Sequence, residues 1–115
     1  MFKFEKLEVW KQAIVLSKEV HQLAKTFPTN ETYVLGAQIK RAADSVALNI
    51  AEGSHGQTNA EQKLFLGYAI RSNLEVVACL FLGKERDLVK QEAFDDLYKK
   101  CESLIRMLQA FRNRL

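Results

Sequence analysis

The sequence predicts an all-α protein folded as an antiparallel, up-down-up-down four-helix bundle. Apolar residues recur with a period near 3.6 over almost all of the 115 residues, which is typical of amphipathic helices. The chain has only five glycines and one proline, few for a protein of strands and turns. The periodic pattern falls into four segments with short connections, and such segments pack as antiparallel neighbours. At this length, residues 1–115 form one domain.

The first segment carries apolar residues at alternating steps of four and three from Val9 to Phe27. This spacing predicts one amphipathic helix that ends before Pro28, because proline disfavours helical geometry in the residue before it. Thr29 or Asn30 is the candidate N-cap of the next helix.

The second segment places Leu35, Ile39, Ala42 and Val46 on one face and surrounds them with small residues. Small residues allow neighbouring helices to approach closely. We expect this helix to stop at Gly53, which suits a C-cap in the left-handed conformation.

The third and fourth helices have clearer signals. Thr58 to Glu61 has the spacing of a capping box and begins the third helix, which is predicted to run to about Gly83. The fourth helix has a heptad-like apolar seam. Its members are Phe94, Leu97, Cys101, Leu104, Leu108, Phe111 and Leu115.

The third helix has more apolar surface than a single bundle needs. Val76 to Leu82 is apolar on every side, and a helix that is apolar all round is normally buried all round. In a four-helix bundle its outer ridge would be an exposed patch of the kind that marks a partner surface. We therefore expect self-association, unless extended termini or a tilted fourth helix cover the ridge. The predicted oligomer interface is Ile70, Leu74, Val77 and Phe81.

The second helix also has a polar stripe that borders its apolar seam. If the second and third helices form a hairpin, residues whose numbers sum to about 112 to 116 lie side by side. We expect Arg41 to pair with Glu75 in a partly buried polar layer that fixes helix register. A catalytic or ligand site is the alternative. The layer consists of Gln38, Arg41, Ser45, Asn49, Ser72 and Glu75.

The charge is mildly basic, with 17 Lys and Arg against 14 Asp and Glu and a net charge of +3. The predicted topology brings the start of the first helix, the second connection and the end of the fourth helix to one end of the bundle. Repeated in an oligomer, a net positive end attracts polyanions. An oligomeric adaptor or structural protein, whose charges serve solubility, is the alternative. The candidate RNA- or DNA-binding residues at this end are Lys3, Lys6, Lys63, Arg106, Arg112 and Arg114.

Signals for catalysis are weak. Glu52 and His55 have the spacing of half a di-iron site, but the other half and two further carboxylates are missing. His21 follows Ser17 by four residues, but no third group near it in the sequence orients the imidazole. No phosphate-binding loop, dinucleotide motif or zinc cluster occurs. We predict no enzyme, no metal and no cofactor.

The compartment is expected to be the cytoplasm. Cys79 and Cys101 have no partner at motif spacing, as for core cysteines of a reducing compartment. The longest apolar run, residues 76–82, is far shorter than the roughly 20 residues that span a bilayer. The N-terminus does not have the pattern of a cleaved leader. We expect no membrane association.

Several motifs together resemble a known family, the 23S rRNA intervening-sequence proteins, often called four helix bundle proteins. The resemblance covers nearly the whole chain. It implies a small bacterial bundle that assembles as a homopentameric ring and carries no catalytic residues. The motifs are Leu7-x-Val9-Trp10, Phe27-Pro28-x-x-Glu31-x-Tyr33-x-Leu35, Gln38-Ile39-x-Arg41-Ala42-Ala43-x-Ser45-Val46-x-x-Asn49-Ile50-Ala51-Glu52-Gly53 and Phe65-Leu66-x-x-Ala69-x-x-Ser72-x-x-Glu75.

The resemblance also bears on partners. A related branch comprises accessory proteins of diversity-generating retroelements, which implies RNA or DNA as a ligand and a reverse transcriptase as a protein partner. Arg71 stands where the family usually has a glycine. This departure either alters packing on the third helix or adds a positive charge to the rim, and under the second alternative Arg71 joins the candidate nucleic-acid-binding residues.

Overall fold

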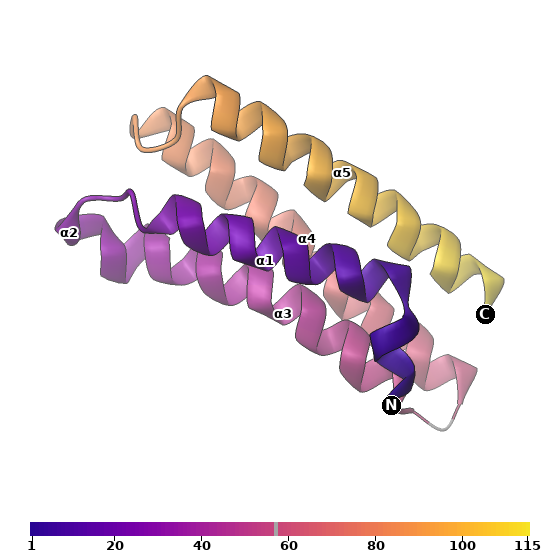
Figure 1. Cartoon of the computed structure of the whole chain (residues 1–115). Helices are drawn as coiled ribbons and strands as arrows, with labels where there is room; N and C mark the ends of the chain where they lie inside the picture. The colour runs from indigo at the N-terminus through magenta and orange to yellow at the C-terminus, as the bar shows by residue number, and fades with distance from the viewer. Residues whose placement is uncertain (57) are drawn as a thin grey trace.

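Four apolar stripes meet along a common axis and hold four long antiparallel helices together in the computed structural model, which describes residues 1–56 and 58–115 (Figure 1). The fold class expected from the sequence is confirmed. Short helical turns precede α1 and join α1 to α3. The elements are η1 (Lys3–Lys6), α1 (Glu8–Ala24), α2 (Thr29–Glu31), η2 (Thr32–Gly36), α3 (Ala37–Ser54), α4 (Asn59–Glu85) and α5 (Gln91–Arg114).

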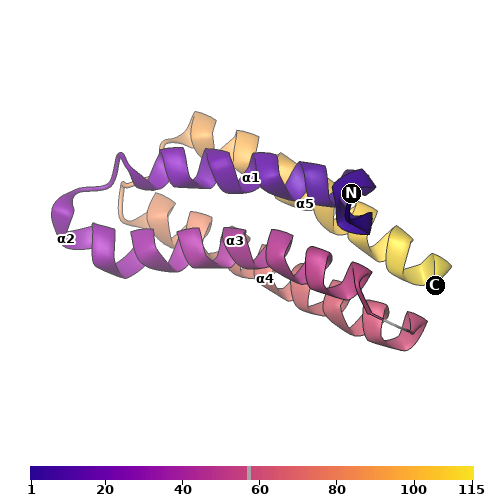
Figure 2. The ribbon, with the colours of Figure 1, turned by 60° about the horizontal axis from the view of Figure 1, so that its bottom comes forward.

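The helices form two layers, with α1 and α5 packed over α3 and α4 (Figure 2). Each long helix packs against the two that are next to it around the bundle. Both termini lie at the end where α3 leads into α4, and α2 lies at the opposite end (Figure 1). The molecule measures 43 × 22 × 21 Å.

The core follows the predicted stripes. The apolar stripes of the first three predicted helices are buried in α1, α3 and α4. The seam of α5 is buried as far as Leu108, and Phe111 and Leu115 at its end are half-buried. Phe27, just before Pro28, is also buried and fixes the entry into α2. The fully enclosed large side chains are Leu16, Leu35, Ile39, Ile50, Leu66, Leu80 and Leu108.

The predicted helix ends are only partly right. Thr58 caps α4, since its side chain accepts a hydrogen bond from the Glu61 N–H at 3.1 Å. The prediction that Thr29 or Asn30 caps the second helix is wrong, because Pro28 holds the N-cap position with an extended backbone. A proline suits this place because its missing N–H would have had no partner.

The prediction that Gly53 ends its helix in the left-handed conformation is wrong. Gly53 lies within α3, where a Cβ would stand 2.7 Å from the Cβ of Phe65 on α4. The glycine is therefore required by the close approach of two helices. The left-handed position is instead taken by Asp87, with φ of 60°, in the connection between α4 and α5.

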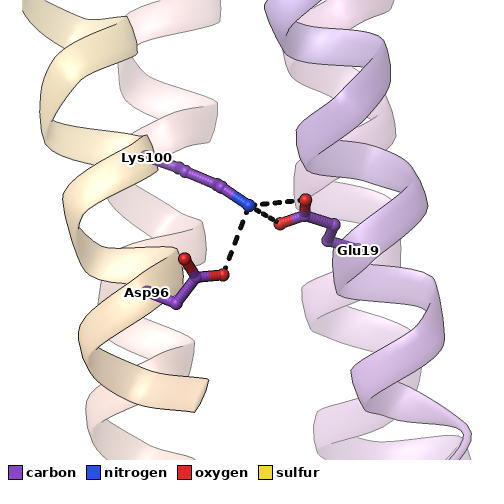
Figure 3. Close-up of polar contacts among 3 residues, drawn as sticks. All are labelled: Glu19, Asp96 and Lys100. Atoms are coloured by element: carbon purple, nitrogen blue, oxygen red, sulfur yellow. Dashed lines mark hydrogen bonds and ion pairs between the residues drawn. The ribbon is translucent and has the colours of Figure 1, made fainter. Parts of the chain in front are cut away.

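An ion triad bridges the seam between α1 and α5 (Figure 3). The Lys100 ammonium donates to both carboxylate oxygens of Glu19 and, at 3.2 Å, to Asp96 one turn earlier on its own helix. The hydrogen bond to Glu19 is the main cause that raises the pKa of Lys100 above its usual value. The triad thus adds a specific polar contact to an otherwise apolar seam.

Helix α4 is by length and composition apolar enough to cross a membrane, with a mean hydropathy of 1.4 over its most apolar window. Core helices of bundles pass the same test, and α4 packs against both α3 and α5. Less than half of that window is buried, however, since the share is 39%. An apolar outer face of α4 is therefore left uncovered.

Candidate nucleic-acid interface

The segments that were predicted to form a basic end lie together in the structure. Lys3 and Lys6 lie in η1, Lys63 lies in the second turn of α4, and Arg112 and Arg114 lie in the last turn of α5. These segments meet at the end that carries both termini (Figure 1). The Asn59 side chain there donates a hydrogen bond to the Leu115 carbonyl oxygen at 3.4 Å, which ties the start of α4 to the end of α5.

Three cations gather on one side of this end. Lys63, Gly67 and Arg71 are spaced by four and share a face of α4. Arg112 Nη1 of α5 lies 3.4 Å from the place where a Cβ on Gly67 would stand. The guanidinium therefore lies against the α4 backbone between the positions of Lys63 and Arg71. We call Lys63, Arg71 and Arg112 the basic strip.

The cations of the basic strip form no ion pair in the described part of the chain, although Glu75 follows Arg71 by four residues on α4 and accepts a hydrogen bond from Gln38 instead. Within residues 1–56 and 58–115, ion pairs are formed by His21, Arg86, Lys100 and Arg106, and by none of the three strip cations. Like charges on one helix face repel each other. A surface that keeps such an arrangement is electrostatically suited to an external anion.

The lysines of η1 lie next to two carboxylates, those of Glu5 and Glu8. Glu5 accepts a hydrogen bond from the Phe2 N–H at 2.8 Å, and Glu8 accepts one from Gln12 at 3.0 Å. Both carboxylates are thus engaged in local helix contacts. Lys3 borders a polar hollow of about 250 Å³ that Asn59 and Gln62 also line.

The other two predicted residues differ in their surroundings. Arg106 pairs with Glu102 on its own helix at 3.6 Å, so its charge is partly compensated. The Arg114 guanidinium lies 5.9 Å from the centre of the Phe111 ring, a cation–π distance, and it lines a groove between α1 and α5. The basic strip, together with Lys3, Lys6 and Arg114, is therefore the better anion surface.

The predicted polar layer lies along the outer edge of the α3–α4 seam, where every member is exposed or half-buried. Ser72 Oγ donates to Ser45 Oγ at 2.9 Å, and Asn49 donates to the same hydroxyl at 3.0 Å. The predicted pair of Arg41 and Glu75 is not among the ion pairs of the described residues; Glu75 instead accepts from Gln38 at 3.5 Å.

The helical period explains this difference. Gln38 and Ser45 are seven residues apart and face α4 together. Arg41 lies about 50° further round α3, at 3.6 residues per turn, and its side chain is exposed. Two polar residues of the described chain are buried, Asn73 of α4 with 0% and Ser54 of α3 with 7% exposure, and the sequence analysis missed both.

The predicted oligomer ridge is split by the packing of α4. Ile70 belongs to the bundle core, with 8% exposure, and is not on an outer surface; Val77 is half-buried. Leu74 and Phe81 are each 53% exposed. The ridge therefore continues on residues the sequence analysis did not select, such as Leu82. We call Leu74, Phe81 and Leu82 the apolar patch.

An aromatic cluster supports the apolar patch. The Phe81 ring meets Phe94 of α5 edge to face at 4.9 Å, and Tyr98 lies 6.2 Å away. Lys84 lies 4.6 Å above the Phe94 ring. Phe81 and Leu82 are near the end of α4 and Lys63 is near its start, whereas Leu74 lies only three residues after Arg71, so the apolar patch and the basic strip meet in the middle of the helix.

The geometry around Ser17 and His21 differs from that of a catalytic site. Ser17 donates to Asp44 Oδ1 at 2.6 Å, and His21 Nε2 is 2.9 Å from the same oxygen. The carboxylate thus stands between imidazole and hydroxyl, whereas a general base must contact the nucleophile. The sequence analysis missed Asp44 because it comes from another helix.

Metal ligands and reactive thiols give no alternative site in the part of the chain that the structure describes. No group of three His, Cys, Asp or Glu residues there could hold a metal ion. Burial raises the pKa of the Cys101 thiol to about 12 and is the main cause that raises the pKa of Cys79. Both thiols are therefore poor nucleophiles at neutral pH.

Comparisons with known proteins agree with the architecture. The profile of the family described as 23S rRNA-intervening sequence protein matches residues 5–110. A search of curated proteins found no match. Among solved structures, the chain is similar to a protein of unknown function from the S23 ribosomal protein family of Bacteroides thetaiotaomicron. The two share 21% identity with a TM-score of 0.84, over 90% of this chain and 97% of the other. At that identity the likeness shows the fold alone.

Proposed function

The chain belongs to the 23S rRNA-intervening sequence protein family, and from this premise we propose that it is a non-enzymatic, self-associating helical bundle that binds RNA or DNA. The basic strip of Lys63, Arg71 and Arg112 makes the contact with phosphates. Lys3, Lys6 and Arg114 extend that contact around the end of the bundle.

The observation that carries the proposal is the grouping of the three cations of the basic strip, none of which takes part in an ion pair within residues 1–56 and 58–115. Three cations share one face, with Arg112 lying over the glycine between the other two. Nucleic-acid phosphates supply several anions at regular spacing, and their neutralisation releases condensed counterions.

Self-association is supported by the apolar patch. Leu74, Phe81 and Leu82 are 44–53% exposed and adjoin an aromatic cluster. A second copy that packs on Phe81 and Leu82 would leave Lys63 and Arg112, at the other end of α4, free. Five copies with a net charge of +3 each would carry +15 in all, and each would offer a basic strip to the same polyanion.

The test is a fluorescence-anisotropy titration of a structured RNA and a duplex DNA at about 50 and 200 mM salt, because phosphate contacts weaken steeply over this range. We expect binding that weakens at least tenfold. The double variant Lys63→Ala/Arg112→Ala should bind more weakly to every sequence. Its slope of log affinity against log salt should be shallower by about 2 per protomer in contact with the duplex.

The matched control is Lys18→Ala/Lys25→Ala. It removes the same charge from exposed positions of α1 and the residue after it. Equal loss in both double variants would mean that only net charge matters and that the basic strip is not the site. Absence of binding at low salt would favour the oligomeric adaptor, and a protein partner such as a reverse transcriptase would then be sought by co-purification.

A further inference from the structure

A second surface feature lies far from the basic strip, near α2. The surface of α1, η2 and α3 has a broad, open depression there, the hollow, with a volume of about 610 Å³. His21, Tyr33, Lys40, Arg41, Asp44 and Leu48 are among the residues that line it. Neither the proposed phosphate contact nor the apolar patch uses any of them.

Tyr33 is held at the hollow by an unusual backbone. It belongs to η2, a π-helical turn between α2 and α3, and its side chain is 84% exposed. π-helical turns are rare and occur frequently at functional sites. An uncovered tyrosine ring offers a face on which another planar ring can stack.

The hollow has both positively and negatively charged side chains, and the carboxylate is held in place by hydrogen bonds. In the described part of the chain, Lys40 and Arg41 take part in none of the ion pairs. Asp44 is fixed through one oxygen, Oδ1, by Ser17 at 2.6 Å and His21 at 2.9 Å. Two free cations suit one phosphate group, whereas the carboxylate disfavours a second phosphate and can accept a hydrogen bond from an amino or imino group.

We propose that this hollow binds one unpaired nucleotide of a single-stranded RNA or DNA. The base stacks on Tyr33, its phosphate lies between Lys40 and Arg41, and Asp44 accepts a hydrogen bond from the base edge. A duplex keeps its bases stacked on one another and offers no free ring to Tyr33. The hollow therefore recognises single strands, whereas the basic strip contacts phosphates of either form.

The test compares a short oligouridine with a DNA duplex of the same length by fluorescence anisotropy. Tyr33→Ala should weaken single-strand binding about 5- to 150-fold, the range measured for loss of one stacked base, and should leave duplex binding unchanged. Tyr33→Phe retains the ring and should bind the single strand as the wild type does. Arg41→Ala should also weaken the single strand selectively.

Val34→Ala is the matched control, because Val34 is 57% exposed on the same π-helical turn but is not among the residues that line the hollow. Unchanged single-strand affinity of Tyr33→Ala would overturn the proposal, as would an equal loss for the duplex or for Val34→Ala. If the wild type binds neither probe, the proposed function fails separately. A titration with uridine monophosphate, followed by amide NMR shifts, then decides: shifts at residues 33, 40 and 41 support the hollow, and their absence overturns it.

Discussion

The buried side chain of Asn73 lowers the stability of the fold. It lies in the core with 0% exposure, and neither its amide nitrogen nor its oxygen has a hydrogen-bond partner in the described part of the chain. Burying an unsatisfied amide costs about 1–3 kcal/mol. A single polar residue in a helical core can nevertheless specify register and oligomeric state at the expense of stability.

Asn73→Leu should therefore stabilise the fold, because leucine has the same number of side-chain heavy atoms and the same branching. We expect the free energy of unfolding in urea to rise by about 1–3 kcal/mol. Asn49→Leu is the control, because Asn49 is half-buried and donates to the Ser45 carbonyl at 2.8 Å. It should show no gain. A loss of stability in Asn73→Leu would mean that the amide makes a favourable interaction.

Cys101 links stability to pH. Burial raises the pKa of its thiol from 9.0 to about 12 in the folded state. The unfolded chain loses this proton near pH 9, so the stabilising effect is complete below pH 9 and is lost as pH rises to 12. The loss amounts to at most about 4 kcal/mol at pH 12.

The measurement is urea unfolding of the wild type and Cys101→Ala from pH 8 to the highest pH at which both remain folded. Cys101→Ala should be less stable at pH 8 because it leaves a cavity, but its stability should fall less with rising pH. Lys100 also titrates in this range, but it is present in both chains, so its effect cancels in the difference. Parallel curves would contradict the linkage.

At the scale of the helical elements, two glycines that both lie within helices differ in the space available for a side chain. A Cβ on Gly53 of α3 would stand 2.7 Å from the Phe65 Cβ of α4, whereas on Gly67 of α4 the nearest atom is the end of the flexible Arg112 side chain at 3.4 Å. Alanine favours a helix over glycine by about 0.8–1 kcal/mol. Only Gly67 can gain that amount without a clash.

Gly53→Ala should therefore lower the free energy of unfolding by about 1–3 kcal/mol, since the helices must move apart. Gly67→Ala should raise it by up to about 1 kcal/mol. Chemical denaturation of both variants tests the pair, each acting as the other's control. Similar effects of both would mean that helix propensity, rather than the approach of α3 and α4, governs these positions.

The same helices show which features could be predicted from the sequence and which could not. Burial imposes a period of 3.6 on every packed helix, so the stripes containing Leu16, Ile39 and Leu104 could be predicted from spacing alone. The role of Gly53 could not, because its constraint comes from Phe65 on another helix. A glycine near a helix end is usually a C-cap, and this local tendency gave the wrong prediction.

The candidate sites depend even more on contacts between helices. The sequence identified Lys63, Arg71 and Arg112 singly, but their grouping depends on Arg112 lying over Gly67. Asp44 meets Ser17 and His21, which are 27 and 23 residues away. To predict such groupings, one must know how two helices are rotated relative to each other. The periodicity of the sequence gives this rotation only to within one or two side-chain positions.

At the scale of the whole molecule, the apolar patch lies on α4 and the basic strip on α4 and α5, and this placement suggests that assembly and binding are coupled. Copies joined through the apolar patch would each present a basic strip, and linked contacts on one polyanion raise the overall affinity by about 10²–10⁴. A single bundle, with its modest net charge of +3, would bind far more weakly.

Phe81→Glu places a charge at the centre of the apolar patch and should convert the assembled protein to monomers, measured by sedimentation velocity, with helicity unchanged by circular dichroism. Ile14→Glu, at a position that is 44% exposed on α1, is the control and should remain assembled. The Phe81→Glu monomer should also bind RNA more weakly and with a shallower salt slope, because each particle then neutralises fewer phosphates. A monomeric wild type would remove the coupling. An assembled Phe81→Glu would move the interface to another face, and a monomeric Phe81→Glu with full RNA affinity would show that one basic strip suffices.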